Sequence, residues 1–437
     1  MSDLTKQPAA GEDAADATAA PAAVDPPQPA AVDPRLLVRE QGFAGYLSDF
    51  KRRVRGGELG SLPVVIGLLV IAVVFQLKNS SFLSADSLAN IGVYTSGLGI
   101  MAVGIVFVLL LGEIDLSVGS VAGVGAAVWA VLSVTNGVND WLAVLIAIAA
   151  GIAIGALHGF FFAKVGVPAF VVTLAGFLGW SGLQIWMMGK EGSINTPTGS
   201  VVENLTGYYF EDKAAAYGLA LIAVLAYAGS LLLDAKRRRA AVLPSRPLSE
   251  ILLRTGVVAL LAFAVAYVLN EPEGARGLPL ALVLFLAVLV LADFVVRRTT
   301  YGRQIFAVGG NAEAARRAGI NVNKIRITVF AVSGMLAAFG GLFIASLSGG
   351  ATKNLGSGNT LMNVIAAAVI GGTSLFGGRG KIWSALLGML VIQSIQQGLN
   401  LLGMASEIQY MITGAVLLAA VVIDSVSRRT QKTAGRT

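Results

Sequence analysis

Apolar runs of about 20 residues recur along most of this chain, and they limit what it can fold into more than any other feature. The sequence has 437 residues, of which 55% are hydrophobic and 13% charged, with a mean hydropathy of +0.75. One soluble core cannot hide that much apolar surface, so lipid must face part of it. The 53 glycines fit this interpretation because small residues let membrane helices approach closely.

We predict an all-α polytopic membrane helical bundle of about 12 transmembrane helices, with possible broken or re-entrant helices. The twelve expected spans are 62-77, 88-111, 117-135, 141-163, 168-188, 215-234, 252-269, 278-296, 327-347, 360-375, 382-403 and 408-425. Because the number of spans is even, both ends of the chain are expected on the same side.

Positive charge is unevenly distributed over the loops between these spans. With the N-terminus inside, only five of the 32 Lys and Arg residues fall outside, which leaves 27 on the inner side. The five outer residues are Lys78, Lys190, Lys213, Arg276 and Lys353. Cytoplasmic loops collect Lys and Arg, so the bias predicts a multi-pass protein of the bacterial inner membrane with cytoplasmic N- and C-termini.

Composition also divides the chain into segments. Residues 1-34 are rich in Ala, Pro and Asp and are predicted to form a disordered cytoplasmic tail. Residues 35-61 are expected to be a basic cytoplasmic segment, and 62-425 the transmembrane domain. A cytoplasmic loop at 297-326 interrupts that domain, and 426-437 is expected to be a second cytoplasmic tail.

Several kinds of chemistry are excluded or disfavoured. The chain has no cysteine, so it cannot build a disulfide, a zinc-thiolate site or an iron–sulfur cluster. Its single histidine, His158, lies in an apolar span and is expected to be a packed polar group; we expect no metal site. No cluster of nucleophiles or acid–base groups indicates an enzyme. Loop asymmetry accounts for the net charge of +7, so nucleic acid is not an expected partner.

The internal loop 297-326 is patterned as a short helix on the membrane surface. Asn311 is a plausible N-cap, Glu313 stands in the first turn, where a carboxylate is favoured, and Gly319 is suited to a left-handed stop. A solvated connector and a docking element for a partner are equally consistent with this local chemistry.

A second motif, Gly-Glu-Ile-Asp-Leu-Ser-Val-Gly, occupies residues 112-119. Glu113 and Asp115 flank a long apolar run, so they should face protein or water and not lipid. Ser117 or Asp115 could simply cap the following helix. A place on a gate or pathway is the alternative.

A third motif, at 363-380, is rich in glycine. Gly371, Gly372, Gly377 and Gly378 would permit a sharp helix break. The segment is not a phosphate-binding loop, because Gly380-Lys381 precedes an isoleucine and Leu375 stands where the leading glycine would be. We therefore expect no ATP to bind here.

Neutral polar side chains occur within two of the expected spans. They are Trp180 and Gln184 in the fifth span, and Gln393, Gln396, Gln397 and Asn400 in the eleventh. Such groups could line a pathway for a hydroxyl-rich solute. Hydrogen bonding between helices explains them at least as well.

The motifs at 112-119 and 363-378, together with the Glu-Ala-Ala and Gly of the internal loop, resemble the permease subunits of bacterial monosaccharide ABC importers of the ribose, galactose and xylose type. The resemblance covers about residues 60-425. It is greatest to the xylose branch, because of Glu113 and an insertion at about 233-296.

The resemblance implies a permease with several partners. A separate ATPase that binds ATP and Mg²⁺ would dock on the coupling residues Glu313, Ala314, Ala315, Arg316 and Gly319. A periplasmic sugar-binding protein would deliver the substrate, and a second copy of the permease would complete the pathway. D-xylose is the first expectation for the cargo, with ribose or another sugar as the alternative.

An ion-coupled secondary carrier is the rival class. It would need groups that bind the driving ion near mid-membrane. Only Glu113 and Asp115 could serve, and the predicted topology places both near the cytoplasmic edge.

Overall fold

The computed structural model describes residues 62–241, 245, 247–271 and 274–433. The expected segments 1-34 and 35-61 lie outside the described residues, as does the end of the segment 426-437. Within the described part, regular structure is almost entirely helical.

The helices, in chain order, are α2 (Leu62–Lys78), α3 (Ala85–Leu110), α4 (Val118–Trp129), α5 (Asp140–Phe160), α6 (Ala169–Met187), α7 (Val201–Gly207), α8 (Lys213–Ala240), α9 (Leu248–Asn270), α10 (Leu280–Arg298), α11 (Thr300–Gly310), α12 (Ala312–Arg317), α13 (Val322–Leu347), α14 (Asn359–Ile370), α15 (Trp383–Leu401) and α16 (Ser406–Thr433). Two π-helical turns, η1 (Ala130–Thr135) and η2 (Phe161–Val165), extend α4 and α5. The strands are β1 (Ser193–Asn195), β2 (Tyr209–Phe210), β3 (Leu278–Pro279) and β4 (Gly350–Thr352).

Each of the twelve expected spans coincides with a helix or with a helix and its π-helical turn. Among the described residues, eight helices are long and apolar enough to cross a membrane: α3, α4 with η1, α5 with η2, α6, α8, α9, α10 and α13. The helices α2 and α14 are apolar but shorter, with 17 and 12 residues. An all-α membrane bundle is therefore confirmed, whereas the count of about 12 stays a prediction.

Side-chain caps fix where several helices begin. The hydroxyl of Ser84 accepts the N–H of Ser87 at 3.3 Å, and the carboxamide of Asn139 accepts that of Leu142 at 3.3 Å. Asn321 does the same for α13 through the N–H of Lys324, at 3.0 Å. Each cap satisfies an N–H that the first helical turn leaves without a partner.

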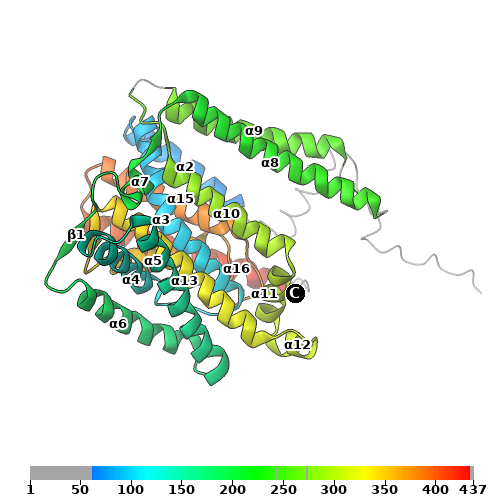
Figure 1. Ribbon diagram of the computed structural model, residues 1–437. Coiled ribbons are helices and arrows are strands. Elements are labelled where there is room, and N and C mark those ends of the chain that lie inside the picture. The colour runs from blue at the N-terminus through cyan, green and yellow to red at the C-terminus, as the bar shows by residue number, and fades with distance from the viewer. Residues whose placement is uncertain (1–61, 242–244, 246, 272–273, 434–437) are drawn as a thin grey trace, which may run out of the picture. The chain divides into compact units, whose positions relative to one another are not determined.

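Loops that were assigned to one side of the membrane meet one another in space. The strands β1 and β4 pair antiparallel, with Ile194 opposite Ala351, and β2 pairs with β3, with Phe210 opposite Leu278. The strands β1, β2 and β4 belong to loops expected outside, and β3 occupies the first two residues of the expected span 278-296, at its outer end. Figure 1 places β1 at one end of the helical unit and α11 and α12 at the other. The loop that carries β1 and the internal loop 297-326 thus lie at opposite ends.

The helix α13 forms the centre of the bundle, where it packs against α3, α4 and α5. Its contact with α5 is made through glycines. A Cβ added to Gly155 would lie 2.1 Å from the carbonyl oxygen of Phe330, and one added to Gly151 would lie 2.4 Å from that of Gly334. The two backbones therefore touch, as small residues permit in membrane helix pairs.

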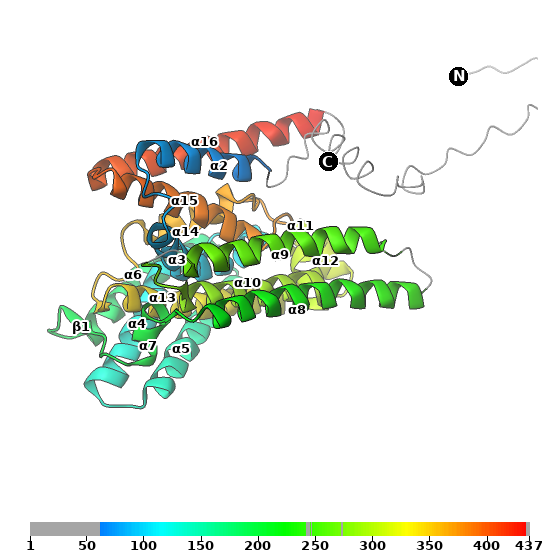
Figure 2. The same cartoon turned by 90° about the horizontal axis from the view of Figure 1, so that it is seen from above.

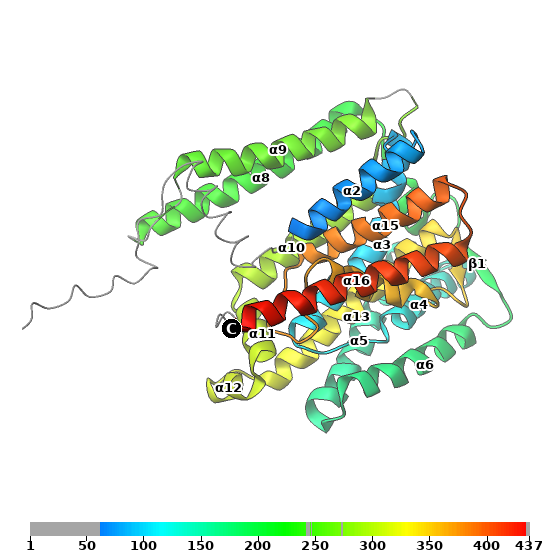
Figure 3. The same ribbon diagram turned by 180° about the vertical axis from the view of Figure 1, so that it is seen from behind.

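Two groups of helices flank this centre. The helices α8 and α9 pack side by side, as Figure 2 shows. They contact the rest through α3, β2 and β3, and Asp234 of α8 also pairs with Arg298 of α10. Seen from behind in Figure 3, α2, α15 and α16 run along another side, and α15 packs against α2, α3 and α14. The helix α3 thus contacts both groups.

We predict that Gly155→Ala destabilises the protein, because its methyl group would overlap the backbone of α13. Overpacking of this kind costs about 1–3 kcal/mol. The change should lower the thermal unfolding midpoint of the detergent-solubilised protein, followed by tryptophan fluorescence. Gly218→Ala in α8 is the matched control, since nothing lies within 4 Å of its added Cβ. Equal midpoints for both variants would contradict the close crossing.

Candidate functional site

The short helix α12 is capped at both ends by the residues that the sequence indicated. The Asn311 Oδ1 accepts the N–H of Ala314 at 2.9 Å. At the other end Gly319 has a φ of +82°, and the N–H of Ile320 donates to the Ala315 carbonyl at 3.0 Å. This left-handed glycine stop fixes the length and position of α12.

The two sides of α12 have different surroundings. Ala315 is buried at 4% exposure and packs in the core of its own chain. Glu313 is 63% exposed and faces Arg317 at 3.3 Å and Arg316 at 3.9 Å. Exposed ion pairs of this kind are weak, so both arginines and the carboxylate remain available to another protein. Ala315 anchors α12, and its exposed residues form a charged outer surface.

Backbone contacts between glycines join α11 to two other segments. A Cβ on Gly309 would lie 1.8 Å from the Leu110 carbonyl oxygen, the same oxygen that accepts the N–H of Gly378 at 3.0 Å. A Cβ on Gly377 would lie 2.7 Å from the Gly309 oxygen and 2.8 Å from the N of Gly112. We call Gly112, Gly309, Gly377 and Gly378 the glycine junction. It connects the segment before α12 with the end of α3 and with the turn after α14.

The helix α14 ends at Ile370, five residues before the end of the span expected there, 360-375. Gly371 cannot carry a side chain, because its Cβ would lie 2.0 Å from the carbonyl oxygen of Ser384. Gly372 follows with a φ of +99°. A non-helical segment then reaches α15 at Trp383.

Asp115, in the turn between α3 and α4, is a buried carboxylate with 3% exposure. Its Oδ1 accepts the Ser117 N–H at 2.9 Å and the Ser117 hydroxyl at 2.6 Å, and its Oδ2 accepts the Ser333 hydroxyl at 3.0 Å. Three donors thus replace the water that the carboxylate loses.

This network continues through the single histidine to α6. The Trp180 Nε1–H donates to His158 Nε2 at 2.8 Å, so that nitrogen carries no proton. In the neutral ring the proton then sits on Nδ1, which lies 3.3 Å from the Ser117 oxygen. We call Ser333, Asp115, Ser117, His158 and Trp180 the polar relay. The four segments that carry it are α13, the α3–α4 turn with α4, α5 and α6.

Sequence analysis missed His158 as a member of this site. One feature of the sequence could have indicated it: Gly176 stands one helical turn before Trp180 on α6. In the structure this glycine makes room for the histidine, because a Cβ at Gly176 would lie 2.4 Å from His158 Nε2. Read alone, that glycine is one of many in the chain. Only the packing of α6 against α4 and α5 shows why it is small.

Glu113 is half-buried beside Arg326 of α13, whose guanidinium lies 4.3 Å above the Phe162 ring. Burial raises the pKa of Glu113 above its usual value, and the positive charge of Arg326 opposes that shift. The carboxylate of Glu113 is therefore less well solvated here than in the unfolded chain.

The side chain of Gln184 hydrogen-bonds α6 to an outer loop. It is 2% exposed, and its Nε2 donates to the carbonyl oxygens of Thr352 at 2.8 Å and Leu355 at 3.2 Å. Its side-chain oxygen fills the space over Gly123, where a Cβ would lie 2.1 Å away. Of the two interpretations of Gln184, hydrogen bonding between segments matches these contacts.

The four polar candidates of α15 meet in one cavity, which we call the outer pocket. Its volume is about 80 Å³, and its lining residues are Ile91, Tyr94, Gln393, Gln396, Gln397 and Asn400. Amides of α15 and the phenol of Tyr94 supply its polar groups, and none of its lining residues is charged. Trp180 and Gln184 are not among them.

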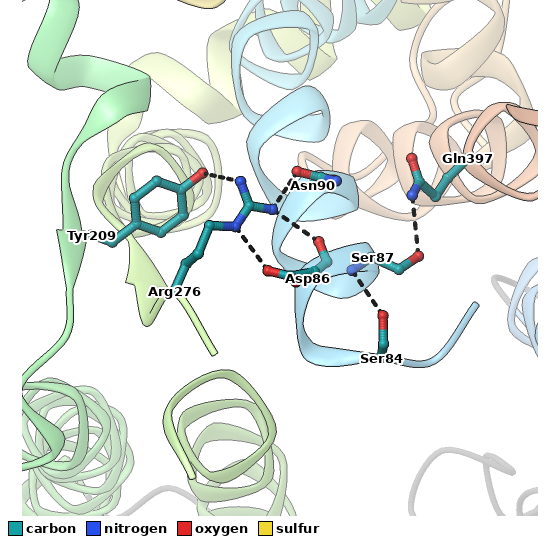
Figure 4. Close-up of polar contacts among 7 residues, drawn as sticks. All are labelled: Ser84, Asp86, Ser87, Asn90, Tyr209, Arg276 and Gln397. Atoms are coloured by element: carbon teal, nitrogen blue, oxygen red, sulfur yellow. Dashed lines mark hydrogen bonds and ion pairs between the residues drawn. The ribbon is translucent and has the colours of Figure 1, made fainter. Parts of the chain in front are cut away.

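Two of these amides are already tied to neighbouring helices. The Gln397 Nε2 donates to the Ser87 hydroxyl of α3 at 3.2 Å, as Figure 4 shows. The Asn400 Oδ1 accepts the Gln409 Nε2 of α16 at 2.8 Å. The pocket is thus held between α3, α15 and α16.

The opposite side of the first turns of α3 is held by Arg276, from the loop between α9 and β3. In Figure 4 its guanidinium reaches Asp86 at 2.9 Å, Asn90 at 2.6 Å and the Tyr209 hydroxyl at 3.5 Å. We call this group the Arg276 clamp. Sequence analysis did not find it, because its members are up to 190 residues apart.

No group of three or more His, Asp or Glu side chains that could hold a metal ion occurs in the part of the chain that the structure describes.

Comparison with known proteins identifies relatives over most of the chain. Residues 87–421 match a family described as the branched-chain amino acid transport system / permease component. The chain is 33% identical to the xylose transport system permease protein XylH of Escherichia coli K12, over 85% of this chain and 94% of the relative. It is also 33% identical to the ribose import permease protein RbsC of the same strain, over 83% and 92%. No solved structure matches.

We predict that Glu113→Gln stabilises the protein at neutral pH. A carboxyl group whose pKa is raised on folding keeps its proton to higher pH in the folded protein than in the unfolded chain. The free energy of unfolding therefore falls as the pH rises from the unfolded pKa to the folded pKa. The glutamine removes that penalty. The variant's unfolding midpoint should exceed that of the wild type at about pH 8 and approach it at about pH 4. A midpoint below that of the wild type at about pH 8 but not at about pH 4 would show that attraction to Arg326 outweighs burial.

Proposed function

Because the chain belongs to the permease subunits of monosaccharide ABC transporters, near their xylose branch, we propose that it carries D-xylose inward across the membrane. It is a multi-pass inner-membrane protein. The outer pocket carries the proposal: neutral amides and a phenol face a cavity on the proposed outer side, which suits a polar, uncharged, hydroxyl-rich cargo. Ribose or another sugar of the family is the alternative.

The size of the outer pocket supports a second copy of the chain. Small-molecule pockets usually enclose roughly 300–1,000 Å³. At about 80 Å³, the outer pocket is much smaller, so we propose that two copies face each other and complete the pathway between them. Gln396 and Tyr94, which is 45% exposed, would then contact the sugar.

An ion-coupled carrier fits the same contacts less well. Asp115 is the buried carboxylate closest to such a role, and both of its oxygens already accept hydrogen bonds from Ser117 and Ser333. Glu113 lies at the end of α3, beside the segments that we place in the cytoplasm. Neither position offers an open ion site within the span.

We further propose that an ATPase subunit, which would bind ATP and Mg²⁺, docks on the outer surface of α12. Glu313, Ala314, Arg316 and Gly319 are exposed there, while Ala315 holds the helix from below. The glycine junction would carry motion of α11 directly to the ends of α3 and α14, since these backbones touch. With α12 in the cytoplasm, about twelve spans would leave both termini in the cytoplasm and the strands outside. A sugar-binding protein would deliver its cargo on that outer side.

We predict that Glu313→Lys uncouples ATP hydrolysis from uptake, because three neighbouring cations would repel a partner that pairs with this face. Uptake should fall at least about fivefold, which corresponds to the weakest typical coupling between two sites, while ATPase activity persists. Purified transporter in proteoliposomes, assayed for both activities, checks this. Glu191→Lys, exposed in an outer loop, is the matched control. Wild-type uptake by the Glu313 variant would remove α12 from the coupling role.

We predict that deleting this chain abolishes xylose uptake. Cells that lack it should regain radiolabelled xylose uptake when it is supplied together with its ATPase and binding protein. Restoration of ribose uptake alone would favour the alternative substrate. Uptake into vesicles under an ion gradient, without ATP or an ATPase, would instead assign the chain to the secondary carriers.

A further inference from the structure

The helices α8 and α10 end, and α9 begins, on the side of α11 and α12 (Figure 2). Positive charge gathers at this end of the three helices. Basic residues occupy positions 236–239 of α8, Arg254 of α9, and Arg297 with Arg298 of α10. Three acidic residues, Asp234, Glu250 and Asp293, lie among them. Among the described residues at this end, seven basic and three acidic groups give a net charge of +4.

The acidic side chains are already paired. Asp234 binds Arg238 at 3.3 Å and Arg298 at 3.0 Å, and thereby joins α8 to α10. Arg254 pairs with Glu250 at 2.8 Å, and Arg297 with Asp293 at 2.7 Å. Within the described residues, Lys236, Arg237 and Arg239 have no carboxylate partner, and all three are exposed.

Exposed apolar side chains lie directly before these cations. Leu232 and Leu233 of α8 are 49% and 57% exposed, and they precede Lys236 and Arg237 by one helical turn. On the adjoining helices, Leu252 is 64% exposed and Phe294 is 57% exposed. The surface therefore changes from apolar to cationic within about one turn, or roughly 5 Å.

The length of α8 matches a bilayer between its charged ends. Lys213, which pairs with Glu271, marks the first end, and Lys236 follows 23 positions later, about 35 Å along the helix. The hydrocarbon core of a bilayer is about 30 Å thick. A span of this length would bring residues 236–239 to the depth of the phospholipid headgroups.

We propose that Lys236, Arg237 and Arg239 bind the phosphate of an anionic phospholipid of the inner leaflet, with its acyl chains on the exposed leucines of α8 and α9. Charge complementarity selects an anionic headgroup, and the Asp234 bridge holds α8 against α10 beside it. An acidic soluble protein would pair with the cations but would leave Leu232, Leu233 and Leu252 uncovered, whereas an acyl chain would cover these exposed leucines. The proposal does not depend on which sugar is carried.

Lipid binding to the purified full-length chain in neutral detergent tests the proposal, with phosphatidylglycerol and phosphatidylcholine of identical acyl chains as probes. Native mass spectrometry would measure the dissociation constants. The wild type should bind phosphatidylglycerol more tightly than phosphatidylcholine. The triple variant Lys236→Gln, Arg237→Gln and Arg239→Gln should bind phosphatidylglycerol at least about tenfold more weakly.

The matched control removes three cations from the same membrane side, through Arg303→Gln, Arg316→Gln and Arg317→Gln, and should keep wild-type lipid affinity. If the α8 variant does not fold, the wild type decides: its affinity for phosphatidylglycerol should fall with rising salt. Equal affinity for both lipids, salt-independent binding, or equal loss in both triple variants would overturn the site. The proposal would also be overturned if the α8 triple variant bound phosphatidylglycerol as the wild type does but no longer bound the ATPase subunit.

Discussion

Backbone contact between α5 and α13 is the constraint on which the rest of the structure depends. Gly151 and Gly155 leave no room for a side chain between the two helices. Two members of the polar relay flank this crossing: Ser333 precedes Gly334, and His158 follows Gly155 by three positions. The close approach brings both within reach of the Asp115 turn, where hydrogen bonds compensate for a buried charge. Packing of small residues thus creates the polar centre.

Polar groups are distributed by function along the bundle. The relay and Glu113 lie near the proposed inner end, where the glycine junction links α11 with α3 and α14. The amides of α15 surround a cavity toward the other end, and their partners are neutral hydroxyls and amides. The outer pocket itself is lined by neutral groups, and the charged Arg276 clamp lies on the opposite side of the first turns of α3.

The sequence predicted a helix at each of the twelve apolar spans, because a span of apolar residues is a strong local signal and charged loops separate one span from the next. It did not predict the short α7, which lies in an outer loop without such a span. It also predicted the ends of α12 from Asn311 and Gly319, whose roles depend only on neighbours along the chain. It could not predict that Trp180 contacts His158 or that Arg276 reaches α3, since these pairs depend on how helices pack. Gln184 shows the same limit, because the sequence does not distinguish a glutamine that lines a pathway from one that hydrogen-bonds two segments together.

The glycine crossing also has a kinematic consequence. With their backbones in contact, α5 and α13 have no compressible layer of side chains between them, so they can neither slide nor twist past each other without losing the contact. They form a keel. If the proposed transporter opens to either side of the membrane, the movement would then involve helices that polar contacts hold in place: α6, which Trp180 and Gln184 hold, and α15, whose Gln397 hydrogen-bonds to α3.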